Sequence, residues 1–427
     1  MKLSYKKVIL TGFAFFLICA FWQAYDNIVP LILVNKFGFS QTQSGVVMAL
    51  DNILALFMLP LFGVLSDKTN TPMGKRKPYV LFGTIVAVTG FLFIPVINNK
   101  YLFIVVLLVV LVAMASFRTP AVALMPDVTC KPLRSKANAV INLMGTAGGI
   151  IVLVFGILFK TSKPGNVNFL TYVISVCLLM LVALVIFVLT VKEPRWSQEM
   201  LSDTERYFRD TETEERNEKG GKLSKSQLLS LVFLLASVVF WFMGYNAVTS
   251  KYSLYAERVL AQDYNLTMMI AQGAAIVSYV PVGCVASKIG RKKTVLAGVL
   301  MLFAAFLSAS FIRSGSSPVV MYALFALAGI GWATINVNSF PMVVELAKDS
   351  DTGRYTGIYY TASMAAQTVT PILSGAVMDA AGNMLPLFVY AAACVGLAFL
   401  TMLFVKHGDS KPATPEDKMT LLAGADD

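Results

Sequence analysis

Residues 63–78 read GVLSDKTNTPMGKRKP, and residues 283–293 echo them with GCVASKIGRKK. Each stretch joins the end of an apolar run to a cluster of basic residues. A second echo lies upstream, because the Phe-Trp pair, the Asn and the Val of residues 21–29 recur at the same spacing in residues 240–248. A third, looser echo pairs an acid with a later arginine: Asp127 with Arg134, and Glu345 with Arg354. Three echoes in one order indicate two homologous halves arranged as a parallel repeat.

The composition excludes an ordinary soluble domain. Of the 427 residues, 57% are hydrophobic and 14% are charged, whereas a soluble chain carries about 25% charged residues. The formal net charge of +11 comes from short basic clusters between apolar runs, which indicates membrane topology and no nucleic-acid partner. The five cysteines form no close pair and the only histidine is His407. The sequence therefore predicts no disulfide framework, metal site or cofactor.

Twelve apolar runs are long enough to cross a bilayer, which takes about 20 residues. The N-terminal run resembles a signal peptide, but it continues past the usual apolar core and has no fitting cleavage site. We therefore interpret it as the first span. The expected spans are residues 8–34, 44–65, 79–97, 101–124, 137–160, 169–191, 227–250, 264–287, 294–312, 318–344, 356–380 and 385–405.

The basic residues predict on which side of the membrane each loop lies. With an even number of spans both termini share one side, and that side holds 27 of the 35 Lys and Arg residues. The other side holds 7, and Arg118 lies within a span. The positive-inside rule therefore places both termini in the cytoplasm of a multi-pass cell-membrane protein. The expected domains are an N-terminal six-helix bundle, a cytoplasmic linker, a C-terminal six-helix bundle and a cytoplasmic tail, over residues 1–191, 192–226, 227–405 and 406–427.

The loop at residues 63–78 carries a family resemblance. Its glycines, its acid and its basic run look like the signature loop between spans 2 and 3 of the major facilitator superfamily. Its longer spacing, together with FRTPAVALMPD (117–127) and RSKANAVINLMG (134–145), resembles the glycoside–pentoside–hexuronide:cation symporters and the sucrose:proton symporters. The resemblance implies an all-α membrane protein with the major facilitator fold, in which twelve transmembrane helices form two pseudo-symmetric six-helix bundles.

The resemblance also implies a network of charges that latches the bundles when the cytoplasmic side is closed. Asp67 stands at the end of span 2, where nearby cations and a helix N-terminus can keep it ionised. Ser287 stands in the place of this acid in the second half, so a second latch is weaker or depends on Glu345 and Arg354. The alternative is that these charges only fix topology. The expected gating residues are Gly63, Asp67, Lys75, Arg76, Asp127, Arg134, Glu345 and Arg354.

Three charged residues lie within apolar spans: Asp26, Asp51 and Arg118. Each costs about 2.5–3.5 kcal/mol at the middle of a bilayer, which the fold alone hardly explains. Asp26 shares a helical face with Gln23 and Asn27, and burial favours the protonated form of a carboxyl group. We therefore expect Asp26, Asp51 and Arg118 to couple transport to a proton. The alternative is that they pair structurally.

Sodium coupling is a weaker expectation. Melibiose-type symporters carry sodium-binding carboxylates lower in span 2, and the corresponding positions here are Ala55 and Leu59. A proton, or transport without a coupling ion, fits these residues better.

Polar and aromatic side chains recur along spans that the resemblance places around a central cavity. Aromatic rings can stack on the C–H faces of a sugar and amides can bind its hydroxyl groups, so this set favours a polar, uncharged solute. The alternative is that Trp and Tyr mark the membrane interface and polar residues hold helices together. The expected substrate-binding residues are Trp22, Gln23, Asn27, Asn142, Trp241, Tyr245, Asn246, Gln272, Trp332, Asn336, Tyr360 and Gln367.

The sequence thus favours a monomeric secondary active transporter, in contact with membrane lipid, that moves a sugar or glycoside by alternating access with a proton as coupling ion. Two alternatives stay open: a carrier of another solute, such as a drug, nucleoside or organic acid, and a membrane sensor that transports nothing. An enzyme is not expected, because the GxSxG, HExxH and GxxxxGK[ST] motifs are absent from the sequence.

Overall fold

The computed structural model describes residues 3–130, 133–163, 168–210, 224–346 and 352–408. This described part is helical: it contains no strand, and Thr71 and Gly74 form an isolated bridge. The all-α class predicted from the sequence is confirmed.

The chain folds into two compact units. Unit 1 comprises Met1–Phe37, Leu50–Thr161 and Gly165–Glu214, and unit 2 comprises Gly38–Ala49, Ser162–Pro164 and Glu215–Asp427.

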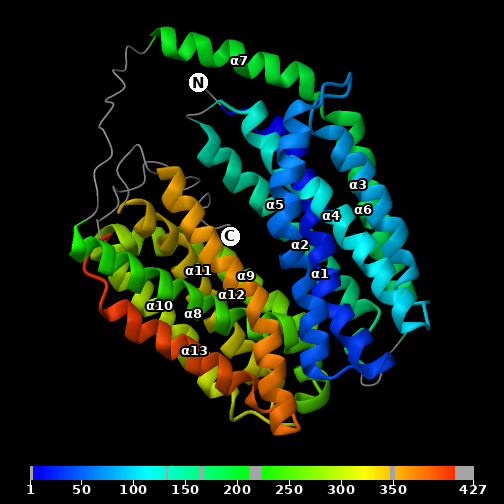
Figure 1. Ribbon diagram of the computed structural model, residues 1–427, viewed down its shortest axis with the longest axis vertical. Helices are drawn as coiled ribbons and strands as arrows, with labels where there is room; N and C mark the ends of the chain where they lie inside the picture. The colour runs from blue at the N-terminus through cyan, green and yellow to red at the C-terminus, as the bar shows by residue number, and fades with distance from the viewer. Residues whose placement is uncertain (1–2, 131–132, 164–167, 211–223, 347–351, 409–427) are drawn as a thin grey trace. The chain divides into compact units, whose positions relative to one another are not determined.

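Unit 1 holds the helices of the first half of the chain (Figure 1). Its first helix ends in a π-helical turn, η1, and the first turns of α2 are counted with unit 2. The helices are α1 (Tyr5–Leu31), η1 (Ile32–Lys36), α2 (Gln41–Lys68), α3 (Lys77–Phe93), α4 (Lys100–Val128), α5 (Arg134–Leu158), α6 (Leu170–Thr190) and α7 (Glu193–Asp210).

Unit 2 repeats this organisation with the helices of the second half. They are α8 (Lys225–Tyr255), the π-helical turn η3 (Ala256–Leu260), α9 (Tyr264–Ile289), α10 (Arg291–Ala309), α11 (Pro318–Val344), α12 (Thr352–Ala381) and α13 (Pro386–Leu403).

Each expected span corresponds to a helix of the structure. Ten of the described helices are long and apolar enough to cross a membrane. The other two candidates are α3, which has 17 residues, and α12, whose polar stripe lowers its hydropathy. The chain is therefore a multi-pass membrane protein, and the count of twelve spans stays a prediction. The helical form follows from the solvent, because a backbone in hydrocarbon must satisfy its hydrogen bonds internally.

Helices α4 and α8 begin at capping side chains. Asn99 accepts hydrogen bonds from the backbone N–H groups of Tyr101 and Leu102 at the start of α4, at 2.9 and 3.2 Å. Ser224 and Gln227 form a reciprocal capping box at the start of α8. Such caps satisfy N–H groups that have no partner within the helix.

Small residues bring α1 and α5 together in unit 1. A Cβ atom at Gly145 would lie 2.8 Å from the sulfur of Cys19, and one at Gly148 would lie 2.8 Å from the carbonyl oxygen of Phe16. Glycine is therefore required for the helices to approach this closely. Small residues serve the same purpose in membrane helices generally.

The start of α2 is held within unit 2. Asp379 of α12 accepts hydrogen bonds from the backbone N–H groups of Gln41 and Thr42, at 2.9 and 2.8 Å. The buried Lys251 of α8 donates a hydrogen bond to the carbonyl oxygen of Gln41 at 2.6 Å. Gly45 also faces the carbonyl group of Pro371 with no space for a side chain. A carboxylate at a helix N-terminus is stabilised by the unpaired N–H groups there.

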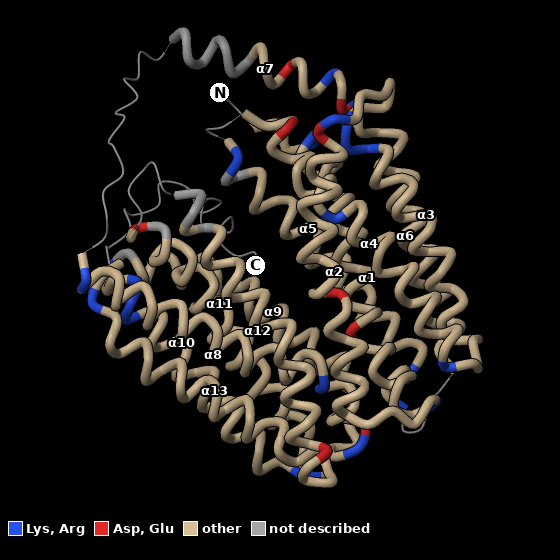
Figure 2. The backbone as a smooth tube through the Cα atoms, viewed as in Figure 1, with Lys and Arg blue, Asp and Glu red and all other residues tan. Residues whose placement is uncertain are grey.

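The outer faces of both units are apolar. Phe57, Phe82 and Leu189 of unit 1 and Phe311 of unit 2 expose 69%, 65%, 75% and 73% of their surface, and Figure 2 shows few charged residues along the middle of the helices. Exposed apolar surface of this extent is typical of contact with lipid.

Candidate functional site

Two acids and one arginine interact within the spans of unit 1. Asp26 of α1, Asp51 of α2 and Arg118 of α4 are each half-buried. The charge of Asp51 acts on Asp26, and the charge of Arg118 acts on Asp51. Asn52 also donates a hydrogen bond from Nδ2 to Oδ1 of Asp51, at 2.9 Å. The structure thus brings together the three residues that the sequence predicted for proton coupling.

Trp22 joins this cluster through Arg118. The guanidinium carbon of Arg118 lies 6.0 Å from the centre of the Trp22 ring, within the range of a cation–π interaction. Tyr25 packs edge-on against Trp22, with ring centres 5.3 Å apart. Among the described residues, neither Nε1 of Trp22 nor the hydroxyl group of Tyr25 has a hydrogen-bond partner, although both atoms are buried.

Amide side chains extend the polar face of unit 1. Gln23 donates a hydrogen bond to Asn27 at 3.4 Å, and both residues lie on α1 with Asp26. Asn142 of α5 is buried, and within the described part of the chain neither its amide nitrogen nor its amide oxygen has a hydrogen-bond partner. Buried polar groups nearly always bind a partner, so unpaired ones point to water or a ligand.

Unit 2 offers an aromatic platform with amides beside it. The rings of Tyr245 and Trp332 lie parallel, 3.6 Å apart and 5° from coplanar, and Phe242 packs edge-on against Trp332 at 5.2 Å. Asn336 follows one helical turn after Trp332, and its buried Oδ1 has no hydrogen-bond partner among the described residues. Asn246 is engaged locally, because its Nδ2 donates to the carbonyl oxygen of Phe242 at 2.9 Å.

The other expected substrate residues of unit 2 differ in exposure. Trp241 is wholly buried, and its Nε1 has no hydrogen-bond partner among the described residues. Gln272 of α9 and Gln367 of α12 are half-buried. Tyr360 is 37% exposed and its ring centre lies 6.0 Å from that of Phe340.

Arg76 is the centre of a charged network at one end of unit 1. Its side chain is buried and forms ion pairs with Asp67 and, at 2.8 Å, with Asp127. Burial alone would lower the pKa of Arg76, but the hydrogen bonds and charges of Asp127 and Asp67 outweigh burial and raise that pKa above its usual value. Gly63 lies one turn before this network. A Cβ atom at this position would lie 3.3 Å from Cγ2 of Thr119, so there is little space for a side chain.

Arg134 lies outside this ion-pair network. Its guanidinium group donates hydrogen bonds to the backbone carbonyl oxygens of Thr129 and Pro126, at 3.2 and 3.0 Å. It therefore caps the C-terminal end of α4, where a cation is favourable, instead of binding Asp127 as the family resemblance implied.

Unit 2 carries the counterpart of this network. Glu345, at the end of α11, forms an ion pair with Arg291 at the start of α10. The sequence repeat pairs Asp127 with Glu345 and places Arg291 in the basic loop that echoes the loop of Arg76. Arg291–Glu345 therefore resembles Arg76–Asp127, although Arg291 aligns with Lys75 and not with Arg76. The sequence predicted the acid but expected Arg354 as its partner. The side chain of Arg354 lies outside the described residues.

Glu193, the first residue of α7, binds the backbone of the loop at residues 63–78. Its carboxylate accepts hydrogen bonds from the backbone N–H groups of Lys75, Arg76 and Lys77, at 2.7, 2.9 and 2.9 Å. The residue is buried, and a Cβ atom at Gly74 (φ 114°) would overlap it. The side chain of Lys75 is exposed, so the contribution of Lys75 to this site comes from its backbone.

Further contacts hold α7 across the end of unit 1 (Figure 1). Lys7 of α1 forms an ion pair with Glu199 and lies 5.8 Å from the Trp196 ring centre. The hydrogen bond from Lys7, and then that from Arg195, lower the pKa of Glu199. Glu199 therefore contributes stability above the ordinary carboxyl pKa, and that contribution is lost as the pH falls through the lowered pKa.

Several residues of these sites were absent from the sequence prediction, among them Tyr25, Asn52, Glu193 and Arg291. Tyr25 precedes Asp26 and so falls off the stripe that marked Gln23 and Asn27. Asn52 is adjacent to Asp51, and neighbours along a helix do not share a face. Glu193 carries a usable signal, because it is an acid directly after a span and close to the predicted basic loop.

Comparison with known proteins agrees with the repeat and the signature loop. A family model described as MFS/sugar transport protein matches residues 11–417 of the chain. An uncharacterised MFS-type transporter of Methanocaldococcus jannaschii is 23% identical over 402 residues, which cover 94% of this chain and 95% of that protein.

Several solved structures share the fold at low sequence identity. The nucleoside transporter NupG matches with a TM-score of 0.67 and 15% identity, covering 94% of this chain and 100% of NupG. The xylose transporter XylE from E. coli matches with a TM-score of 0.68 and 14% identity, covering 96% of this chain and 98% of XylE. A peptide transporter POT matches with a TM-score of 0.70 and 11% identity, covering 94% of this chain and 93% of POT.

Proposed function

Since the chain belongs to the MFS/sugar transport protein family, whose members transport solutes across membranes and are not enzymes, we propose that it is a secondary active symporter for a sugar or glycoside. The transport mechanism in this proposal is alternating access, and the coupling ion is a proton.

The observation that carries the choice of solute is the platform of Tyr245 and Trp332 beside Asn336. Parallel rings 3.6 Å apart offer a flat apolar face, on which the C–H face of a sugar ring can stack. The unpaired Oδ1 of Asn336 can accept a hydrogen bond from a sugar hydroxyl group. In unit 1 the unpaired amide of Asn142 and the Nε1 of Trp22 provide further hydrogen-bonding groups for a neutral solute.

The proposal of a proton rests on the cluster of Asp26, Asp51 and Arg118. Two carboxyl groups whose charges interact can share one proton, so the pair titrates as a unit. We propose Asp26 as the group that holds the proton, because Asp51 is the acid on which the positive charge of Arg118 acts. In the proposed cycle Asp26 is protonated when the sugar binds and releases the proton on the other side.

The charged networks have a proposed role in gating. Arg76 with Asp67 and Asp127, and Arg291 with Glu345, are ion pairs near the ends of helices. We propose that they stabilise one conformation of the transport cycle and weaken in the other. The excess of Lys and Arg on the same side supports a cytoplasmic position for these networks and for both termini, in the cell membrane.

Uptake into proteoliposomes tests the function directly. The purified chain is reconstituted and offered radiolabelled sugars, glycosides and nucleosides, with and without an inward proton gradient. A gradient of one pH unit corresponds to a factor of ten in concentration, so one proton per sugar should support about tenfold accumulation. Accumulation of a nucleoside instead would reject the sugar, and binding without uptake would indicate a sensor.

Substitution of the acids tests the coupling. Asp26→Asn and Asp51→Asn should each abolish accumulation, so that the internal solute reaches only about the external concentration, while exchange of labelled for unlabelled solute continues. Asp263→Asn is the matched control, because it removes one carboxylate at the start of α9 and leaves a residue that caps helices well. Full gradient-driven accumulation in both single variants would refute proton coupling through this cluster.

A further inference from the structure

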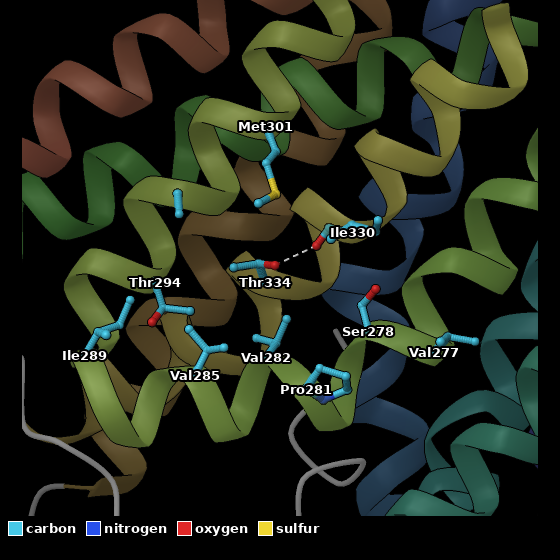
Figure 3. A pocket seen from close by; sticks show the side chains of 11 residues that line it. Val277, Ser278, Pro281, Val282, Val285, Ile289, Thr294, Met301, Ile330 and Thr334 are labelled. Carbon is cyan, nitrogen blue, oxygen red and sulfur yellow. Dashed lines mark hydrogen bonds between the residues drawn. The ribbon is translucent and has the colours of Figure 1, made fainter.

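Unit 2 contains an apolar groove of about 240 Å³ between α9, α10 and α11 (Figure 3). Helix α11 forms its floor with Ile330 and Thr334. The two walls come from α9 and α10. They are lined by Val277, Ser278, Pro281, Val282, Val285 and Ile289 of α9, and by Thr294, Ala297 and Met301 of α10.

The groove arises because α9 and α10 both pack on α11 but meet each other along little of their length. Gly329 and Gly331 allow this close approach, since a Cβ atom at Gly331 would lie 2.8 Å from the carbonyl oxygen of Gly298 on α10, and one at Gly329 would overlap Ala271 on α9. Val277, Val285 and Ile289 are 75%, 45% and 44% exposed. The groove is therefore open along its apolar wall.

One end of the groove lies at the α9–α10 turn, which is basic. On α9, Lys288 follows Val285 by three residues and Pro281 by seven, so it lies on the face that lines the groove. On α10, Lys293 precedes Ala297 by four residues and therefore shares its face. The apolar walls on both sides thus continue into a lysine at the same end.

These two lysines differ from their basic neighbours in what they contact. Lys292 donates hydrogen bonds to the carbonyl oxygens of Leu403 and Val405, at 3.0 and 2.5 Å, and Arg291 is paired with Glu345. Lys288 and Lys293 are exposed, and neither forms an ion pair with another described residue. They leave two positive charges open to a ligand at the end of an apolar groove.

We propose that this groove binds an anionic phospholipid, with one acyl chain along α11 and the phosphate group between Lys288 and Lys293. The groove lies on membrane-spanning helices and its walls are mainly apolar, so they suit the hydrocarbon chain of a lipid. Basic residues next to such a groove attract anionic head groups, because each lysine near an anionic lipid contributes to binding. A zwitterionic phospholipid can place its chain in the same groove but gains less from the two lysines.

Native mass spectrometry of the full chain in detergent tests this proposal. The protein is incubated with equal amounts of phosphatidylglycerol and phosphatidylcholine that carry identical acyl chains. We expect wild-type protein to retain phosphatidylglycerol preferentially. Removal of one lysine should weaken its retention about fivefold, and the double variant Lys288→Ala/Lys293→Ala should remove the preference.

Two further variants distinguish binding of the lipid head group from binding of the acyl chain. Ala297→Trp places a large ring in the groove at an exposed position and should reduce retention of both lipids. Lys6→Ala/Lys225→Ala removes two exposed lysines at the starts of α1 and α8 and should leave retention unchanged. If Lys6→Ala/Lys225→Ala lost as much phosphatidylglycerol as Lys288→Ala/Lys293→Ala, retention would reflect general attraction to surface charge, and the proposal would be overturned. Unchanged retention in the Lys288/Lys293 double variant or in Ala297→Trp would also overturn it.

Discussion

Trp332 is largely buried, and two other aromatic residues fix the orientation of its ring. Tyr245 lies parallel to it at 3.6 Å and Phe242 meets it edge-on, so its orientation is set before a solute arrives. A preorganised ring gives stacking energy at little cost in conformational entropy. In the proposed function, Trp332 therefore contributes through its aromatic face and not through the indole N–H.

Trp332→Ala should raise the KM for the transported solute roughly tenfold, because an aromatic contact and its buried area are both lost. Trp332→Phe keeps a ring and should recover most of the affinity. Initial rates of uptake over a range of solute concentrations measure both effects, and thermal unfolding of each variant shows whether the fold is intact. Equal KM values for the two folded variants would show that Trp332 only packs the core.

The sequence singled out residues most clearly where their presence was costly, and their role in proton coupling stays a prediction. Asp26, Asp51 and Arg118 stood out because charge is rare in apolar spans, and the structure shows that their charges interact. Trp241 was a weaker prediction, because a Trp in a span is equally suited to a cavity or a core, and it is wholly buried. Tyr25 and Asn52 carry no such cost, so nothing in the pattern distinguished them from ordinary polar residues.

At the scale of elements, α7 is where the sequence was least informative. Residues 192–226 are rich in both signs of charge, which is typical of a solvated linker. The structure instead places Glu193 beneath three N–H groups of the loop before α3 and pairs Glu199 with Lys7. Contacts between residues more than 100 positions apart leave no local period in the sequence.

Glu193→Gln should lower the stability of the folded protein by about 1–2 kcal/mol, because the amide keeps the shape of the side chain but loses the charge at a helix N-terminus. The melting temperature of the purified protein measures this loss. Glu199→Gln is the control, since Glu199 is a half-buried carboxylate of the same helix that binds side chains and no backbone N–H groups, and it should give a smaller decrease. A larger decrease for Glu199→Gln would mean that α7 is held by its surface ion pairs alone.

At the scale of the whole molecule, each half of the chain carries an ion pair between its basic loop and a later acid. The repeat in the sequence predicted two similar halves, and Arg76–Asp127 and Arg291–Glu345 join corresponding segments of them, although Arg291 aligns with Lys75. The family resemblance implied other partners, Arg134 and Arg354, because the resemblance marks residue types and not their contacts. The segment 192–226, expected from the sequence to be a linker, also bears on the whole molecule, because its helix α7 is part of unit 1.

A chain divided after Asp210 should therefore give a more stable first half than a chain divided after Val191. Co-expression of each first fragment with its matching second fragment, followed by affinity purification through a tag on the second, measures how much of the first half assembles. We expect several-fold more of the fragment that retains α7. Equal recovery from the two divisions would show that unit 1 does not need this helix.

The hydrogen bonds between Glu193 and the loop before α3 can form only after the ribosome has synthesised Glu193. Lys77 and Glu193 are 116 positions apart, and at about 5–20 residues per second that stretch takes roughly 6–23 s to synthesise. During this interval α3 has no carboxylate over its first turn, although α4, α5 and α6 are already leaving the ribosome. The insertion of the first helices and the completion of unit 1 are therefore separated in time. A pause in translation just before codon 193 would lengthen the interval in which the loop is accessible to membrane proteases.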